Sequence, residues 1–168
     1  MNPIIAMLKH ALQAERDGYY HYRTASDHTD DPKAKEVFDK LAQDELAHHK
    51  MLEETLASVE KGGPMPAFSE ADRGTWGKLN GPSPIFSGDF LRRIKDPHFA
   101  MSALSIGMAL EQNGINFYGE MERMADHPAL KKMCRFLVQW EQSHLEALSA
   151  QLKLFQETTW ADARFAPF

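Results

Sequence analysis

The chain has 168 residues, of which 43% are hydrophobic and 26% charged, a composition typical of a globular domain with a buried core. With 19 Lys and Arg against 24 Asp and Glu, the net charge of −5 argues against a nucleic-acid-binding protein, which usually presents a basic face. The single cysteine, Cys134, excludes an intrachain disulfide and a four-cysteine metal site within this chain and favours a reducing, cytoplasmic compartment.

Four helices are predicted, and each is opened by a proline. Proline is favoured in the first turn of a helix, because the amide that it lacks would have no partner there. The helices are predicted to begin at Pro3, Pro32, Pro97 and Pro128. In three cases the preceding residue is Asn or Asp, which are strong N-caps, and in the fourth it is the weaker His127. Apolar residues spaced by three and four follow each proline, which indicates amphipathic helices.

The connections between these helices differ in length. Short turns near 26–31 and 125–127 predict two antiparallel hairpins. A Gly- and Pro-rich stretch, about 61–95, separates the hairpins as one long crossover, within which 69–79 and 87–94 are expected to form helical turns. The predicted fold is therefore all-α, a ferritin-like four-helix bundle over residues 1–157 with a C-terminal tail over 158–168. No signal peptide and no membrane-spanning helix are expected.

The chain also contains an internal duplication. With an offset of 96 residues, segments 15–52 and 111–148 match without gaps at 11 of 38 positions, whereas average residue usage gives about 2 or 3. Each hairpin is thus predicted to be one copy of a repeated unit. The matched positions that carry chemistry are Glu15/Glu111, Tyr22/Tyr118, Glu45/Glu141 and His48/His144.

Carboxylates and imidazoles repeat within the apolar helix faces. Residues three or four apart share a face, so each of these glutamates is expected to point inward, and each histidine shares the face of the glutamate three residues before it. Buried ions cost several kcal/mol each, but two divalent cations would balance four carboxylates. A mixed carboxylate and imidazole set favours iron or manganese over metals that prefer thiolates. The predicted ligands are Glu15, Glu45, His48, Glu111, Glu141 and His144; a polar network of Glu–His pairs is the alternative.

Several neighbours of this cluster have two possible roles. Tyr22 and Tyr118 lie on the faces of Glu15 and Glu111, where each hydroxyl could donate to a ligand carboxylate and take part in catalysis, or simply pack in the core. Gly18 and Gly114 either leave room for a small oxidant or permit close helix packing. The duplication aligns Leu145 with His49, so His49 is expected to flank the site or to face solvent. Cys134 is expected to pack inside, and the remaining histidines are expected at the surface or in caps.

The segments AERDGYYHY, DELAHH, ALEQNGINFY and WEQSH resemble the rubrerythrin-like, ferritin-like di-iron proteins. This resemblance covers about 3–60 and 97–157 and implies a di-iron site with peroxide or dioxygen chemistry. Two departures stand out. Rubrerythrins proper carry a four-cysteine rubredoxin module, which one cysteine cannot form, and they carry a second glutamate three residues after the third helix's ligand, where this chain has Gly114.

The expected function is a non-haem di-iron oxidoreductase that reduces peroxide or dioxygen with electrons from an external donor, such as a rubredoxin-type protein. The expected cofactor is two Fe ions, with Mn or Zn as alternatives in the isolated protein. A ferroxidase or other iron-handling protein, and a non-catalytic metal-binding module, stay open. Because 99–110 is apolar nearly all round, a homodimer that covers this helix is expected.

Overall fold

The computed structural model describes residues 3–63 and 97–162, and nearly all of them are helical. The helices are α1 (Pro3–Asp27), α2 (Pro32–Lys61), α4 (Pro97–Met124) and α5 (Pro128–Asp162). Each begins at a predicted proline, and the described residues contain no strand. The predicted all-α bundle of two hairpins is therefore confirmed.

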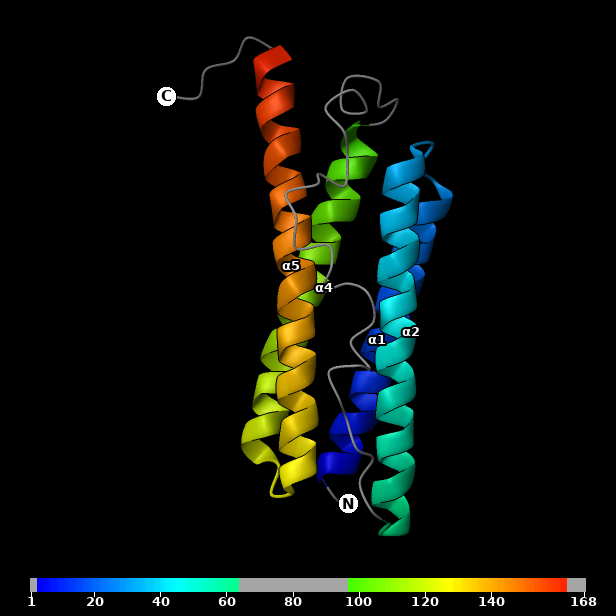
Figure 1. The fold of residues 1–168 in the computed structure, drawn as a ribbon, viewed down its shortest axis with the longest axis vertical. Coiled ribbons are helices and arrows are strands. Elements are labelled where there is room, and N and C mark those ends of the chain that lie inside the picture. The colour runs from blue at the N-terminus through cyan, green and yellow to red at the C-terminus, as the bar shows by residue number, and fades with distance from the viewer. Residues whose placement is uncertain (1–2, 64–96, 163–168) are drawn as a thin grey trace.

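The two hairpins lie side by side along one long axis (Figure 1). Within each hairpin the helices are antiparallel, α1 packing against α2 and α4 against α5, and the hairpins meet mainly through α1 and α4. Helices α2 and α4 run in the same direction (Figure 1). This is the ferritin-like connectivity, in which one long connection joins two short-turned hairpins.

Local signals explain the limits of α2. The Asp31 carboxylate accepts a hydrogen bond from the Ala34 N–H at 2.8 Å, which is the N-cap expected before Pro32. The helix ends at Lys61 and is capped by Gly62, whose φ of 62° is left-handed. The Gly63 N–H donates to Ser58 O at 2.9 Å. This pairing satisfies a carbonyl of the last turn.

The inward faces match the predicted apolar periodicity. The core contains large side chains from all four helices, with the polar cluster embedded among them. Side chains that are at most 2% exposed include Leu8, Tyr22, Phe38, Leu41, Leu104, Tyr118, Leu137, Trp140 and Leu148. The site is thus built into the core rather than into surface loops, and helix packing fixes the positions of its residues.

Helix α5 is longer than predicted. The tail was expected from Thr158, but the helix continues to Asp162. No glycine or proline occurs between Phe155 and Ala166, so no strong stop signal ends the helix at Thr158. The interior of the predicted crossover, with the helical turns expected at 69–79 and 87–94, lies outside the described residues.

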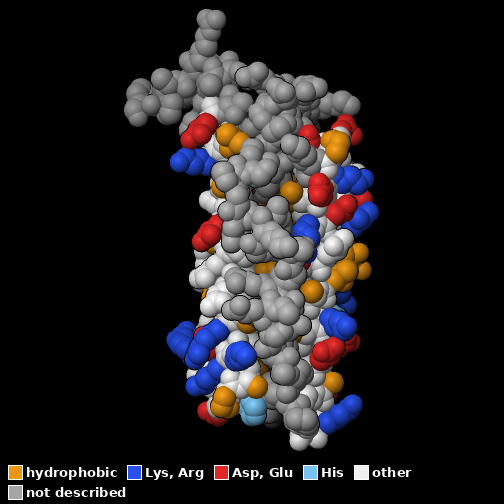
Figure 2. Space-filling view, viewed as in Figure 1, with side chains coloured by type: hydrophobic (Ala, Val, Ile, Leu, Met, Phe, Trp, Pro, Cys, Tyr) orange, Lys and Arg blue, Asp and Glu red, His pale blue; other side chains and the backbone are white. Residues whose placement is uncertain are grey.

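Charged side chains of both signs line the described parts of the face in Figure 2. No helix among the described residues is long and apolar enough to cross a bilayer. Ile106, within the apolar 99–110 stretch, is 51% exposed, so the described residues cover this helix only in part.

We expect Asp31→Ala to lower the free energy of unfolding by about 1 kcal/mol, because the Ala34 N–H loses its cap. Urea denaturation followed by circular dichroism measures this change. Gln43→Ala, at an exposed position of the same helix, is the control and should stay within about 0.5 kcal/mol of wild type. Equal stability of the two variants would contradict the capping role.

Candidate metal centre

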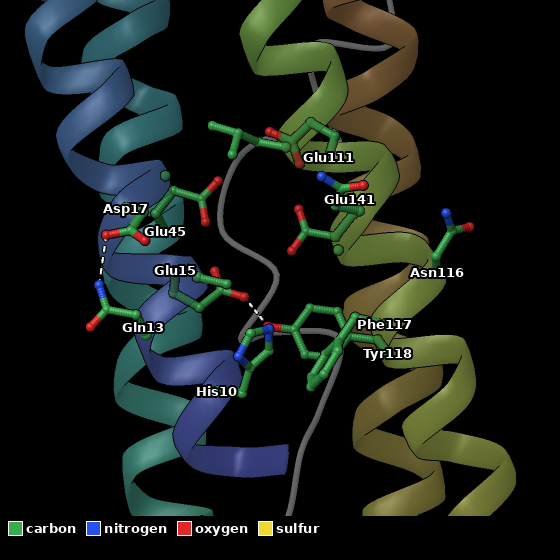
Figure 3. Close-up of a pocket in the computed structure, with 15 residues that line it drawn as sticks. His10, Gln13, Glu15, Asp17, Glu45, Glu111, Asn116, Phe117, Tyr118 and Glu141 are labelled. Atoms are coloured by element: carbon green, nitrogen blue, oxygen red, sulfur yellow. Dashed lines mark hydrogen bonds between the residues drawn. The ribbon is translucent and has the colours of Figure 1, made fainter. Parts of the chain in front are cut away.

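Each helix contributes one glutamate to the middle of the bundle. Glu15, Glu45, Glu111 and Glu141 are only 2–5% exposed. The carboxylates of one hairpin face those of the other across the space between them (Figure 3). All four therefore lie where the periodicity predicted, and the structure brings them together.

The two histidines aim the same ring nitrogen at these carboxylates. His48 Nδ1 lies 3.1 Å from Glu15 Oε2 and 3.1 Å from Glu141 Oε1. His144 Nδ1 lies 3.5 Å from Glu111 Oε2 and 3.4 Å from Glu141 Oε2. Both rings are fully buried. Because Nδ1 of each ring faces the carboxylates, it is the atom that can bind a cation at the centre.

The six residues form two overlapping groups, in each of which one ligand atom per residue lies within 4.8 Å of the others. Both groups share Glu45 and Glu141, so each of these two carboxylates could contribute to either subsite. The His48 subsite comprises Glu15, Glu45, His48 and Glu141, and the His144 subsite comprises Glu45, Glu111, Glu141 and His144.

The two tyrosines connect the hairpins. The Tyr22 hydroxyl of α1 donates a hydrogen bond to Glu111 Oε1 of α4, and the Tyr118 hydroxyl of α4 donates to Glu15 Oε1 of α1 (Figure 3). Each tyrosine thus holds the glutamate of the opposite copy, and each carboxylate keeps its other oxygen toward a histidine. The predicted contact is present, whereas a catalytic role for the hydroxyls stays a prediction.

Burial and mutual repulsion hold protons in the cluster when no cation is present. Burial, assisted by the charge of Glu141, raises the pKa of Glu111 to about 8. Burial and the charges of Glu15 and Glu141 raise the pKa of Glu45 well above its usual value. Burial acts to raise the pKa of Glu141 too, but the charge and hydrogen bond of His48 outweigh it and hold that pKa well below the usual value. A cation entering the site must therefore displace protons.

The donor set fits two divalent cations. Metal–oxygen and metal–nitrogen bonds of about 2.1 Å separate the ligand atoms around one ion by at most about 4 Å, close to the spacing within each subsite. Buried Glu141 Oε2 has no hydrogen-bond partner among the described residues, which leaves an acceptor oxygen directed to the centre. Four carboxylates with two imidazoles suit iron or manganese better than metals that prefer sulfur.

A cavity of about 590 Å³ between α1 and α4 leads to this centre. The four glutamates, Tyr118, Gly18 and Gly114 line it (Figure 3). A Cβ at Gly18 would lie 3.1 Å from Glu45 Cδ, and one at Gly114 would lie 3.3 Å from Glu141 Cγ. The glycines therefore make room for the two shared carboxylates and also border the cavity, so both of their predicted roles are compatible with the geometry.

Sequence reasoning missed one contact of the cluster and misplaced one histidine. Buried Asp44 of α2 lies 3.3 Å from His144 Nε2; the only signal for it was an acidic residue directly before Glu45. His21 was expected at the surface, but it is half-buried and its Nε2 donates to Ala103 O at 3.0 Å, because α4 packs against this side of α1. His49 belongs to neither subsite, as expected.

Cys134 is fully buried, as predicted for a residue that packs inside the bundle. Burial, with a smaller contribution from the charge of Glu122, raises the pKa of its thiol to about 12. The thiol is therefore protonated at neutral pH, which agrees with a packing role.

Two duplicated hairpins with one glutamate on each of two helices, and Glu-x-x-His on each of the other two, define a ferritin-like carboxylate protein. The first hairpin is similar to rubrerythrin: the family model for rubrerythrin matches residues 6–77, which confirms the resemblance over α1 and α2. No curated protein matches the chain. The family model does not extend to the second hairpin, which is related to the first by the internal duplication.

We expect the affinity for Co²⁺ to rise with pH between 6 and 8. Below pH 8 the ion has to displace the proton of Glu111, and each displaced proton changes the affinity about tenfold per pH unit. Calorimetric titration in buffers of different ionisation enthalpy measures both the affinity and the protons released. Affinity independent of pH, with no proton release, would contradict this electrostatic description.

We further expect Gly18→Ala and Gly114→Ala to weaken Co²⁺ binding by about tenfold, because the new methyl group pushes a shared carboxylate. The matched control is Gly119→Ala on α4, where an added Cβ meets nothing within 4 Å. This control should stabilise the helix by up to about 1 kcal/mol without changing Co²⁺ binding. Wild-type affinity in all three variants would show that the glycines do not position the carboxylates.

Proposed function

We propose that the protein is a di-iron oxidoreductase that reduces hydrogen peroxide or dioxygen with electrons from an external donor. The observation that carries this proposal is the pair of buried subsites that share Glu45 and Glu141. Two ferrous ions held there would supply one electron each to a small oxidant. Glu15 and His48 would complete one subsite, and Glu111 and His144 the other.

The surrounding residues support chemistry at this place. The helices bury the cluster, and the cavity between α1 and α4 leads to it. Tyr22 and Tyr118 hold their protons firmly, since burial and the neighbouring carboxylates raise both pKa values well above 10. Their hydroxyls therefore keep donating to Glu111 and Glu15, and they orient these ligands while charge at the centre changes.

Gly114 distinguishes this chain from the rubrerythrin pattern. It lines the cavity at the position where that pattern has a second glutamate, so no carboxylate projects from there toward the cluster. The chain therefore lacks the second glutamate of the rubrerythrin pattern. We propose that any shift of ligands during reaction is made by the shared carboxylates of Glu45 and Glu141.

Iron handling is the second candidate, with Fe²⁺ itself as the substrate of a ferroxidase. The rim of the cavity favours it, because the rim is polar and carries the carboxylate of Asp17. The exposed polar side chains that line the cavity are His10, Gln13, Asp17, Asn113 and Asn116. A hydrated cation could enter between them.

The proposed partners follow from what the chain itself contains. One cysteine cannot hold a rubredoxin-type iron, so the electrons are proposed to come from a separate donor protein of that type in a reducing cytoplasm. A homodimer is proposed to cover the exposed part of 99–110, where Ile106 is 51% exposed.

The test is anaerobic loading with Fe²⁺, then addition of peroxide or dioxygen with and without a chemical reductant. We expect about two Fe per chain and repeated turnover when reductant is present. Glu141→Gln should lose both ions because Glu141 belongs to both subsites, while exposed Glu54→Gln should retain them.

Oxidation of several Fe²⁺ per site without reductant would favour the ferroxidase instead. A protein that retains no iron would refute both candidates.

A further inference from the structure

Among the positions at which the duplicated halves differ, one pair of residues contacts the two histidines. With the offset of 96 residues, Asp44 of α2 corresponds to Trp140 of α5. Both residues directly precede a shared glutamate, and both are at most 3% exposed. Each reaches the histidine of the opposite hairpin, Asp44 contacting His144 and Trp140 contacting His48. The outer side of each histidine is therefore built differently.

His144 has a carboxylate behind it. Its Nε2 lies 3.3 Å from Asp44 Oδ2, on the opposite edge of the ring from the Nδ1 that faces Glu111 and Glu141. The other oxygen, Asp44 Oδ1, accepts a hydrogen bond from Lys40 Nζ at 2.8 Å. Lys40 thus fixes the carboxylate, and the carboxylate selects the tautomer of His144 with hydrogen on Nε2 and a lone pair on Nδ1.

His48 has an aromatic ring in the equivalent place. The rings of His48 and Trp140 meet edge to face at 84° with centroids 4.4 Å apart. Buried His48 Nε2 has no hydrogen-bond partner among the described residues. Indole nitrogen is a donor and cannot accept from this atom. The tautomer of His48 that could bind a cation through Nδ1 therefore buries an unsatisfied N–H, which disfavours it.

We propose that the two subsites are unequal and fill in order, with the first divalent cation bound at the His144 subsite and the second, more weakly, at the His48 subsite. The inference rests on the two-metal centre proposed above. Asp44 is the positioning residue that produces the difference, acting through His144. Carboxylates behind ligand histidines typically change metal affinity by about 10- to 100-fold, and this sets the expected gap between the two steps.

Titration with Co²⁺, followed by calorimetry and by visible absorbance, tests the order. Wild-type protein should bind two Co²⁺ in steps that differ at least tenfold in affinity. Asp44→Asn, which keeps the shape and removes the charge, should weaken the tight step about tenfold and leave the weak step within about threefold. His144→Gln should lose the tight step, whereas His48→Gln should retain it.

Trp140→Phe is the matched control at the corresponding position. Phenylalanine keeps a ring against His48 and introduces no acceptor, so both steps should stay as in wild type. If Asp44→Asn does not fold, NMR of the Co²⁺-loaded wild-type protein gives an independent readout. One hyperfine-shifted imidazole N–H, that of His144, should exchange with solvent more slowly than the other, because Asp44 holds it.

The results separate this inference from the proposed function. Two Co²⁺ ions bound with equal affinity, or an Asp44→Asn variant in which both steps weaken alike, would overturn the ordered filling and leave the metal centre intact. A tight step lost in His48→Gln but retained in His144→Gln would reverse the assignment and also overturn the inference. A protein that binds neither Co²⁺ nor Fe²⁺ would refute the metal centre itself.

Discussion

The structure depends on the burial of four carboxylates and two imidazoles in the middle of a helical bundle. An all-apolar core would make folding more favourable, because each buried ion loses its solvation by water. Protons relieve part of this cost, as the raised pKa values of Glu45 and Glu111 indicate. Divalent cations relieve it more fully, since they can bind the ionised oxygens of both subsites at once. The arrangement is consistent with a cation-binding site that is preorganised by the packing of the helices.

Duplication explains how so polar a centre is held in place. Each hairpin brings one glutamate and one Glu-x-x-His, and each tyrosine reaches across to a glutamate of the other copy. The duplication therefore makes the two subsites alike in their residues. The residues packed against the outer sides of the two histidines are not alike, because Asp44 in one half corresponds to Trp140 in the other. A carboxylate behind one histidine and an indole ring behind the other give the two halves different properties.

Much of this could be predicted from the sequence, because the relevant signals are local or repeated. Prolines mark the helix starts, and spacing by three and four marks the inward faces. The missing parts depend on tertiary contacts. Asp44 meets His144 100 residues away, and no local pattern indicates such a contact across the bundle. The end of α5 was misplaced because its sequence has no strong stop signal before Pro167.

The most direct measurement is an anomalous diffraction experiment at the iron absorption edge, on crystals of the protein equilibrated anaerobically with Fe²⁺. The account predicts two peaks about 3.5–4 Å apart, each beside one histidine Nδ1, with the carboxylates of Glu45 and Glu141 between them. A centre without peaks, or with iron only at surface carboxylates, would contradict it.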